Sequence, residues 1–322
     1  ARIAGVEGRL LEHVADQLAL AVEAREVAPR HPFGDPGQQL EGLAGIAALV
    51  EGDARAVHCE ILVDQQVGEA QIAGCTARIQ SGAERGDSLF AAYYNRGLAR
   101  YLKGEYDLAI ADYDHAIAVK GEADAFVGRG LAYFHKNEFN LANADFTRAI
   151  ELNPDAAEAY YRRGTTYAAL EKFDAAIADF DRAITLKRDF PEAVYNRGGT
   201  YYAKRSFGQA LTDFDRYVRL RPWIAEGFEA RGHVHNAMGQ LDAAINDFNR
   251  AIRLDPKEKA NYRGLNAALA AMSRYEEQLE SLKALREIDP EDAFAHVAAY
   301  TPCARLERFD IALPLLERAV QL

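Results

Sequence analysis

Small and aromatic residues recur through most of the chain with a period of about 34 residues. Within one such unit, Tyr160, Gly164 and Tyr167 stand at positions i, i+4 and i+7, a spacing that places them on one stripe of an α-helix. A second stripe with the same spacing follows and consists of Ala176, Phe180 and Ala183. The pattern therefore predicts two helices per unit, each with one apolar face.

Several series of positions keep this period in phase. Glycines that follow an arginine recur at Gly97, Gly130, Gly164, Gly198 and Gly232. The alanine series is Ala109, Ala142, Ala176, Ala210 and Ala244. The aromatic series is Tyr113, Phe146, Phe180, Phe214 and Phe248. Prolines close four of the units, at Pro154, Pro222, Pro256 and Pro290. Since neither helix can bury its stripe alone, the units should stack into a one-dimensional solenoid.

This register resembles the tetratricopeptide repeat (TPR) family, whose landmarks fall here on Tyr160, Gly164, Tyr167, Ala176, Phe180 and Ala183. The resemblance covers residues 90–322. It implies an all-α fold, a right-handed superhelical solenoid of helix-turn-helix repeats. The solenoid is expected over 69–322, with a half repeat at 69–89 and repeats that begin at 90, 123, 157, 191, 225, 259 and 293. The last two repeats are degenerate, because Asn266 and Tyr300 replace the glycine.

Local signals predict where helices start and where they are disturbed. Asp155, followed three residues later by Glu158, is typical of a capping box at the start of a first helix. Four aspartates are placed to cap second helices: Asp107, Asp174, Asp242 and Asp310. Pro302 and Pro314 fall inside the two helices of the last repeat, so both helices should be kinked or shortened.

Residues 1–68 do not keep the period. The stretches 10–27 and 40–50 fit amphipathic helices, 30–37 fits a loop, and 56–63 fits a short strand. Three interpretations stay open: divergent helices that cap the solenoid, a separate module, or a spurious extension that does not pack. Because the sequence starts at Ala1 and stops at Leu322, before the last repeat closes, we expect it to be a fragment of a longer protein.

The composition excludes several classes of protein. Hydrophobic residues make up 49% and charged residues 27% of the chain, which is typical of a folded protein. The net charge of -11 disfavours nucleic-acid binding unless one face is locally basic. The longest apolar stretch, 42–50, is shorter than the roughly 18 to 20 residues of a membrane span. The compartment stays open, cytoplasmic or exported.

The family resemblance also implies a ligand surface, since the variable positions of the first helices line the concave face in that family. Here these positions are Tyr94, Tyr101, Val127, Phe134, His135, Tyr161, Tyr195, Tyr202, His233 and Asn236. Tyrosine combines a large contact area with one hydroxyl, which suits peptide recognition. Alternatively, some of these rings pack against neighbouring helices. A subgroup of the family grips a C-terminal carboxylate with Lys and Asn, and the matching positions hold neither residue: Tyr94, Leu98, Val127, Leu131, Tyr161, Thr165, Tyr195 and Gly199.

Five units carry an arginine where the family prefers leucine, together with an aspartate in the second helix. The arginines are Arg96, Arg129, Arg163, Arg197 and Arg231, and the aspartates are Asp112, Asp145, Asp179, Asp213 and Asp247. Because every arginine has a matching acid, we expect a structural ladder of Arg–Asp pairs. The alternative is a row of guanidinium groups that binds an acidic ligand.

No catalytic or metal-binding set is apparent. His233 and His235 are two residues apart, so a helix directs them about 200° apart. His58 and Cys59 have no third member of a nucleophile set nearby. Cys59, Cys75 and Cys303 lack disulfide or zinc spacing, and no cofactor is expected.

These patterns predict a non-catalytic protein–protein interaction scaffold that binds a partner peptide or helix in a concave groove. The alternative is the recruiting or regulatory arm of an enzyme whose catalytic domain lies outside this chain. Self-association through the solenoid ends is a further possibility.

Overall fold

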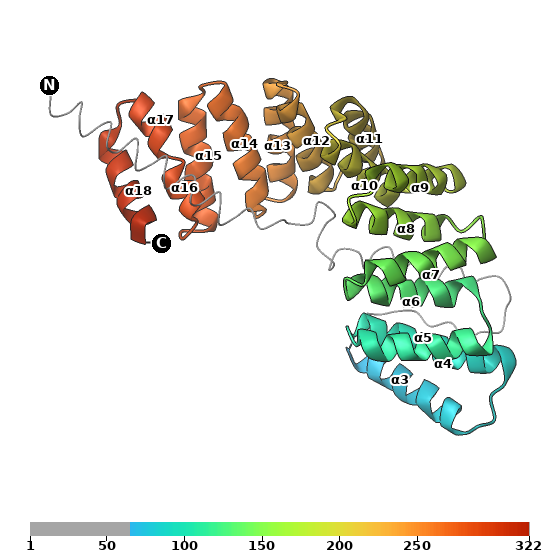
Figure 1. The fold of residues 1–322 in the computed structure, drawn as a ribbon. Helices are drawn as coiled ribbons and strands as arrows, with labels where there is room; N and C mark the ends of the chain where they lie inside the picture. Colours follow the sequence, from blue (N-terminus) through green and yellow to red (C-terminus); the bar gives the residue numbers. More distant parts are fainter. Residues whose placement is uncertain (1–64, 322) are drawn as a thin grey trace. The chain divides into compact units, whose positions relative to one another are not determined.

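The computed structural model describes residues 65–321. Every regular element of these residues is an α-helix, and no strand occurs among them (Figure 1). This result confirms the predicted all-α class. The elements expected at 10–27, 40–50 and 56–63, and the residues His58 and Cys59, lie outside the described part of the chain.

The helices follow one another in pairs joined by short turns, after a first helix α3 (Gln65–Gln80) that packs on α4. The pairs are α4 (Gly86–Leu102) and α5 (Tyr106–Val119), α6 (Ala123–His135) and α7 (Phe139–Leu152), α8 (Ala157–Ala169) and α9 (Phe173–Leu186), α10 (Pro191–Ala203) and α11 (Phe207–Leu220), α12 (Ala225–Ala237) and α13 (Leu241–Leu254), and α14 (Lys259–Ala271) and α15 (Tyr275–Ile288). The last group is α16 (Ala293–Val297), α17 (Tyr300–Arg305) and α18 (Phe309–Gln321).

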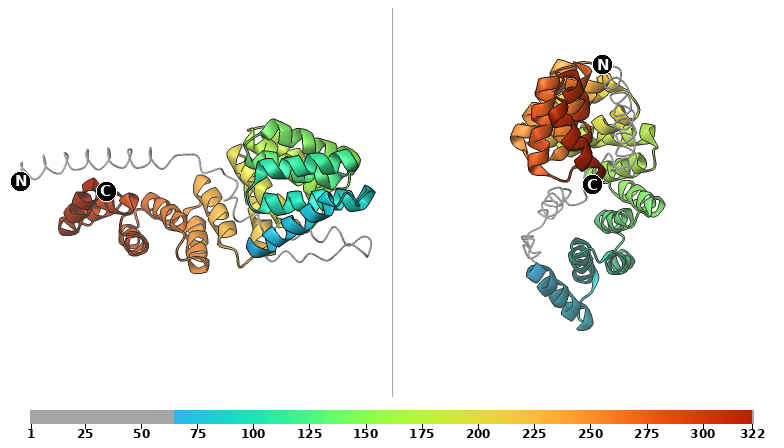
Figure 2. Two further views of the ribbon diagram at one scale, coloured as in Figure 1. Left: turned by 90° about the horizontal axis from the view of Figure 1, so that it is seen from below. Right: turned by 90° about the vertical axis from the view of Figure 1, so that its left-hand side faces the viewer.

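The chain divides into two compact units, of which the structure describes residues 65–200 and 201–321. We call them the N-terminal unit and the C-terminal unit. Their boundary lies inside α10. Within each unit, successive helices lie side by side, as the further views show (Figure 2).

The repeating core contact places a ring of the second helix against a glycine of the first helix. In the N-terminal unit, a Cβ at Gly164 would lie 2.9 Å from Cε1 of Phe180 and 3.2 Å from the carbonyl oxygen of Ala176. In the C-terminal unit, a Cβ at Gly232 would lie 3.1 Å from Cε1 of Phe248. Both rings are fully buried. The small residues of the sequence pattern therefore allow each ring to reach the facing backbone.

The turn between the two helices of a repeat is a Schellman motif. After α8, Glu171 adopts a left-handed conformation with φ 56°, its N–H donates to Ala168 O at 2.9 Å, and Lys172 N donates to Tyr167 O at 2.8 Å. These two bonds satisfy carbonyl groups at the end of the helix. Among the described turns of this kind, the left-handed residue is glycine only at Gly104 and Gly239.

The predicted side-chain caps of the second helices are wrong. The N-cap residues of α5, α9 and α13 are Glu105, Lys172 and Gln240, and none makes a side-chain cap bond. The predicted residues lie instead in the first turns of α5, α9, α13 and α18, at Asp107, Asp174, Asp242 and Asp310. The physical reason is the Schellman turn: the residue that closes it also starts the next helix. The aspartates two positions later face the positive end of the helix dipole.

The predicted capping box of α8 is also wrong. The N-cap residue is Ala156, which makes no side-chain cap bond. Glu158 instead accepts from Nε of Arg162, one turn later, at 2.6 Å. The carboxylate that the pattern assigned to the cap therefore serves a partly buried ion pair.

The two prolines of the last repeat behave differently. Pro302 lies in the first turn of α17, and the first helix of this repeat is split into α16 and α17, which confirms the expected shortening. Pro314 does not shorten the second helix, because α18 continues across it from Phe309 to Gln321. Pro314 is exposed, so water can satisfy the carbonyl that loses its helical donor.

Candidate binding surface

An arginine in the first helix joins three helices. In the C-terminal unit, Arg231 of α12 donates from Nε and Nη2 to the two carboxylate oxygens of Asp247 in α13, at 2.8 and 2.7 Å. Its Nη1 donates to Asp215 of the preceding helix α11 at 2.8 Å. In the N-terminal unit, hydrogen bonds join Arg96 to Asp112, Arg129 to Asp145 and Arg163 to Asp179. Arg231 therefore connects its own repeat to the repeat before it.

The fifth predicted pair comprises Arg197 and Asp213. Arg197 contacts Asp181 of the preceding second helix, as Arg231 contacts Asp215. Asp213 is 2% exposed.

Hydrogen bonds to the aspartates raise the pKa of the ladder arginines Arg96, Arg163 and Arg231, although burial opposes this shift. The side chain of Asp112 is 1% exposed and that of Asp179 is 9% exposed. Burial raises the pKa of Asp145, although its hydrogen bond with Arg129 opposes that shift. Because carboxylates of the protein already occupy these guanidinium groups, the geometry favours the structural interpretation over binding of an acidic ligand.

In the next repeat, both the arginine and the aspartate of the ladder are replaced. Leu265 stands one period after Arg231, and Ser281 stands one period after Asp247. Leu265 is 6% exposed, and Ser281 accepts a hydrogen bond from Nδ2 of Asn266 at 3.0 Å. Loss of the cation thus coincides with loss of the carboxylate.

Two of the tyrosines predicted to contact a ligand are buried. Tyr101 is 8% exposed and Tyr161 is 6% exposed. The ring of Tyr161 lies 5.0 Å from that of Phe190, and its hydroxyl accepts from Nδ2 of Asn196 at 3.2 Å. Burial raises the pKa of Tyr161 to about 12. These rings pack against neighbouring repeats, as the alternative interpretation expects.

The side chain of His135 packs against two tyrosine rings. Its ring is stacked on Tyr106 at 5.2 Å and lies 5.4 Å from Tyr101. Burial, assisted by the positive charge of Arg162, lowers the pKa of His135.

The remaining predicted residues are more accessible. Tyr94, Val127, Phe134 and Tyr195 are half-buried in the N-terminal unit. In the C-terminal unit, Tyr202 is 39% exposed, the side chain of His233 is 42% exposed, and Asn236 is half-buried. We call these positions, with Leu98, the first-helix face. It is apolar and aromatic in the N-terminal unit and largely polar in the C-terminal unit.

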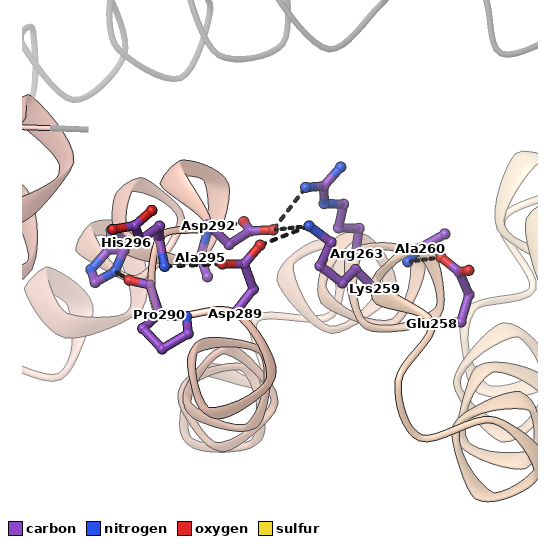
Figure 3. A network of polar contacts seen from close by, with 10 residues as sticks. Glu258, Lys259, Ala260, Arg263, Asp289, Pro290, Asp292, Ala295 and His296 are labelled. Carbon is purple, nitrogen blue, oxygen red and sulfur yellow. Dashed lines mark hydrogen bonds and ion pairs between the residues drawn. The ribbon is translucent and has the colours of Figure 1, made fainter.

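A charged network that the sequence analysis missed joins α14 to the loop before α16 (Figure 3). Nζ of Lys259 donates to Asp289 at 2.8 Å, and Nη2 of Arg263 donates to Asp292 at 2.9 Å. Asp292 also caps α16 by accepting from the N–H of Ala295 at 3.0 Å. These charges make the face of α14 polar.

The network replaces a ring contact of the N-terminal unit. Arg263 and Asp292 stand three periods after Tyr161 and Phe190, whose rings pack together. This set of charged residues recurs in no other repeat, so periodicity gave no signal for it.

Other chemistry is sparse. Within residues 65–321, no helix is long and apolar enough to cross a membrane. The same residues contain no group of three or more His, Cys, Asp or Glu side chains arranged to hold a metal ion. Cys75 and Cys303 are buried, and Cys303 is a free thiol.

The fold and its repeated contacts define an all-α helical-repeat protein. Family models described as tetratricopeptide repeat match residues 90–122, 157–190 and 225–258, and one described as TPR repeat matches 130–171. The matched residues are therefore tetratricopeptide repeats. Such folds are in general scaffolds for protein–protein interaction, and proteins of this family are generally non-catalytic.

Solved structures show the same fold. The chain is 17% identical to the C-terminal part of a TPR repeat-containing protein from Cytophaga hutchinsonii, with a TM-score of 0.58, and the match covers 73% of this chain and 99% of that one. It is 17% identical to a tetratricopeptide repeat protein from Parabacteroides merdae, with a TM-score of 0.55, covering 82% and 99%. YrrB, described as a TPR protein with an unusual peptide-binding site, is 26% identical, with a TM-score of 0.49, covering 55% and 91%. No curated protein matches the chain.

Proposed function

We propose that the chain is a non-catalytic scaffold that binds a peptide or helix of a partner protein on its first-helix face. The observation that carries this proposal is the set of half-buried apolar and aromatic side chains in the N-terminal unit, namely Tyr94, Leu98, Val127, Phe134 and Tyr195. Half-buried rings offer contact area at low entropic cost, and aromatic residues are frequent among the side chains that dominate binding energy. Tyr101 belongs to the buried cluster against which Tyr94, Leu98, Val127 and Phe134 pack.

The first helices of the two units carry different side chains at these positions. The N-terminal unit favours apolar and aromatic side chains. In the C-terminal unit, the ring of Tyr202 is retained, whereas Glu229, His233, Asn236 and Arg263 at other corresponding positions favour polar side chains. The enzyme-arm alternative would use the same surface and stays a prediction.

The experiment selects binding peptides from a random display library on the immobilised full chain. A labelled selected peptide is then titrated by fluorescence anisotropy against the chain and against the double variant Tyr94→Ala, Tyr195→Ala. We expect at least about tenfold weaker binding, because truncation of a dominant contact removes more than ~1 kcal/mol.

The matched control is the double variant Leu108→Ala, Leu141→Ala, which removes apolar side chains that are 49% and 48% exposed on second helices. Binding to this control should stay within about twofold of the unaltered chain. Circular dichroism checks that both variants keep their helices. Equal affinity for all three proteins would refute the proposal.

A further inference from the structure

Basic side chains, most of them exposed, gather on the second helices of the C-terminal unit. Arg216 and Arg219 stand three residues apart on α11, so they lie on one side of that helix. Arg250 and Arg253 occupy the equivalent positions of α13, one period later. Trp223 and Lys257 lie in the loops that follow α11 and α13, and they are also one period apart. We call these six residues the basic patch.

Arg231 and its neighbour Phe228 show that the two rows of the patch flank the same first helix. Arg231 of α12 reaches Asp215, which precedes Arg216, and Asp247, which lies one turn before Arg250. The guanidinium groups of Arg231 and Arg250 lie 5.6 and 5.7 Å from the ring centroid of Phe228. The side chain of Phe228 therefore contacts the row on α13 through Arg250, and Arg231 links the same helix to α11.

Most of these cations lack an acidic partner. Arg219, Arg250, Arg253 and Lys257 are exposed, and none makes an ion pair with another residue of the described chain. Asp255 lies in the adjoining loop, where its Oδ1 accepts from the N–H of Lys257 at 3.1 Å.

The equivalent positions in the N-terminal unit differ. Arg148 pairs with Glu151 at 2.8 Å, and Arg182 lies 3.7 Å from Asp155. The excess of positive charge therefore belongs to α11 and α13.

Trp223 adds an apolar element to the charge. It is 62% exposed, which is the greatest exposure among the large aromatic side chains of residues 65–321. Arginine and tryptophan are the residues that most often dominate binding energy at protein interfaces. Unpaired guanidinium groups also bind carboxylates with two parallel hydrogen bonds.

We propose that the basic patch binds a short acidic segment of a partner protein, on a surface separate from the first-helix face. The extent of the patch favours a short ligand. On the next second helix, α15, the positions equivalent to Arg216 and Arg219 hold Ala284 and Glu287, and Glu280 precedes them on the same side.

Both glutamates are exposed, and neither makes an ion pair with another described residue. A long nucleic acid carries one negative charge per about 1.7 Å and would meet these carboxylates beyond the patch. A few consecutive acidic side chains would not.

Trp223 provides the readout, because it is the only tryptophan of the chain. The full chain is titrated with hexaglutamate at about 50 mM salt while tryptophan emission is recorded. We expect a saturable change in emission, and an affinity at least about tenfold weaker at about 300 mM salt, because screening weakens contacts between exposed charges.

A charge-reversal pair then locates the site. Arg219→Glu with Arg253→Glu should weaken hexaglutamate binding by at least about tenfold. Arg148→Glu with Arg182→Glu changes the net charge equally on the N-terminal unit and should weaken it less than about twofold. Circular dichroism and thermal melting show whether the variants stay folded.

Several results would overturn the proposal. They are an unchanged emission at millimolar peptide, equal losses in the two charge-reversal variants, or tighter binding of a 20-nucleotide single-stranded DNA than of hexaglutamate. Sedimentation showing self-association that disappears in Arg219→Glu, Arg253→Glu would assign the patch to a second copy instead. None of these outcomes depends on whether peptides bind the first-helix face.

Discussion

Replacement of Arg163 by leucine tests whether the ladder stabilises the fold through charge. Arg163 holds both oxygens of Asp179 at 2.7 and 2.8 Å, and its Nη1 donates to Thr147 at 3.2 Å. The carboxylate is 9% exposed and has no other partner among residues 65–321. Removing one member of a buried ion pair costs about 3–5 kcal/mol, because the other charge stays desolvated.

The lower end of this range applies, since the side chain of Arg163 is 17% exposed and water can reach the vacated space. We expect Arg163→Leu to lower the free energy of unfolding by about 3 kcal/mol, or roughly two orders of magnitude in the folding equilibrium. Asp179→Ser should cost about 1–2 kcal/mol, because the arginine side chain that remains can turn toward solvent.

The chain itself supplies the compensating pair, since Leu265 and Ser281 occupy the corresponding positions three repeats after Arg163 and Asp179. The double variant Arg163→Leu, Asp179→Ser should lose only about 1 kcal/mol, which gives a coupling of at least about 3 kcal/mol between the two sites. Urea denaturation followed by circular dichroism measures the midpoints, and amide exchange in α8 and α9 reports the local effect. If the double variant is as unstable as Arg163→Leu, the stranded carboxylate is not the cause.

Three further predictions concern turns, packing and pH. Glu171→Gly should raise the free energy of unfolding by about 0.5–1 kcal/mol, because glycine adopts the left-handed conformation without strain. Gly239→Ala should lower the free energy of unfolding by about 1 kcal/mol. Urea midpoints of the two variants that move in the same direction would contradict this. Gly264→Ala should cost about 1–3 kcal/mol by overpacking, since the new Cβ would clash with the ring of Phe248, and an unchanged melting temperature would refute the tight contact. Because the folded state lowers the pKa of His135, the unfolded chain takes up the proton first as the pH falls, and stability should be lost between about pH 7 and pH 5. His135→Phe should lose less stability over that interval, and urea titrations at the two pH values compare them.

The periodic core could be predicted from the sequence because its residues repeat. The glycine, alanine and ring series fix which sides of the two helices meet, and the pair Gly164 and Phe180 shows that contact directly. The second partner of three ladder arginines, Arg129, Arg197 and Arg231, also had a signal. These partners are Asp114, Asp181 and Asp215, and each follows a ladder aspartate by two positions.

Other features had no periodic signal. Glu171 adopts a left-handed conformation that its residue type does not favour, and only the neighbouring hydrogen bonds reveal why. Tyr161 occupies a position that is variable in the family, and its burial depends on Phe190, a residue of the following loop. The charged residues of α14 occur once, so repetition could not distinguish them from solvated surface.

The ladder ends inside the C-terminal unit, so different interactions hold the helices before and after that point. Arg231 is the last arginine of the ladder. Its side chain donates hydrogen bonds to α11 and to α13, and none to α14. Helices α14–α18 can therefore separate from α13 without breaking a guanidinium bond of the ladder. Apolar contacts such as Phe248 against Gly264, and the long ion pair of Arg274 with Asp242 at 3.8 Å, resist that opening. Local unfolding that begins in α14–α18 should stop before α13. Unfolding of α13 would separate Arg231 from the buried carboxylate of Asp247.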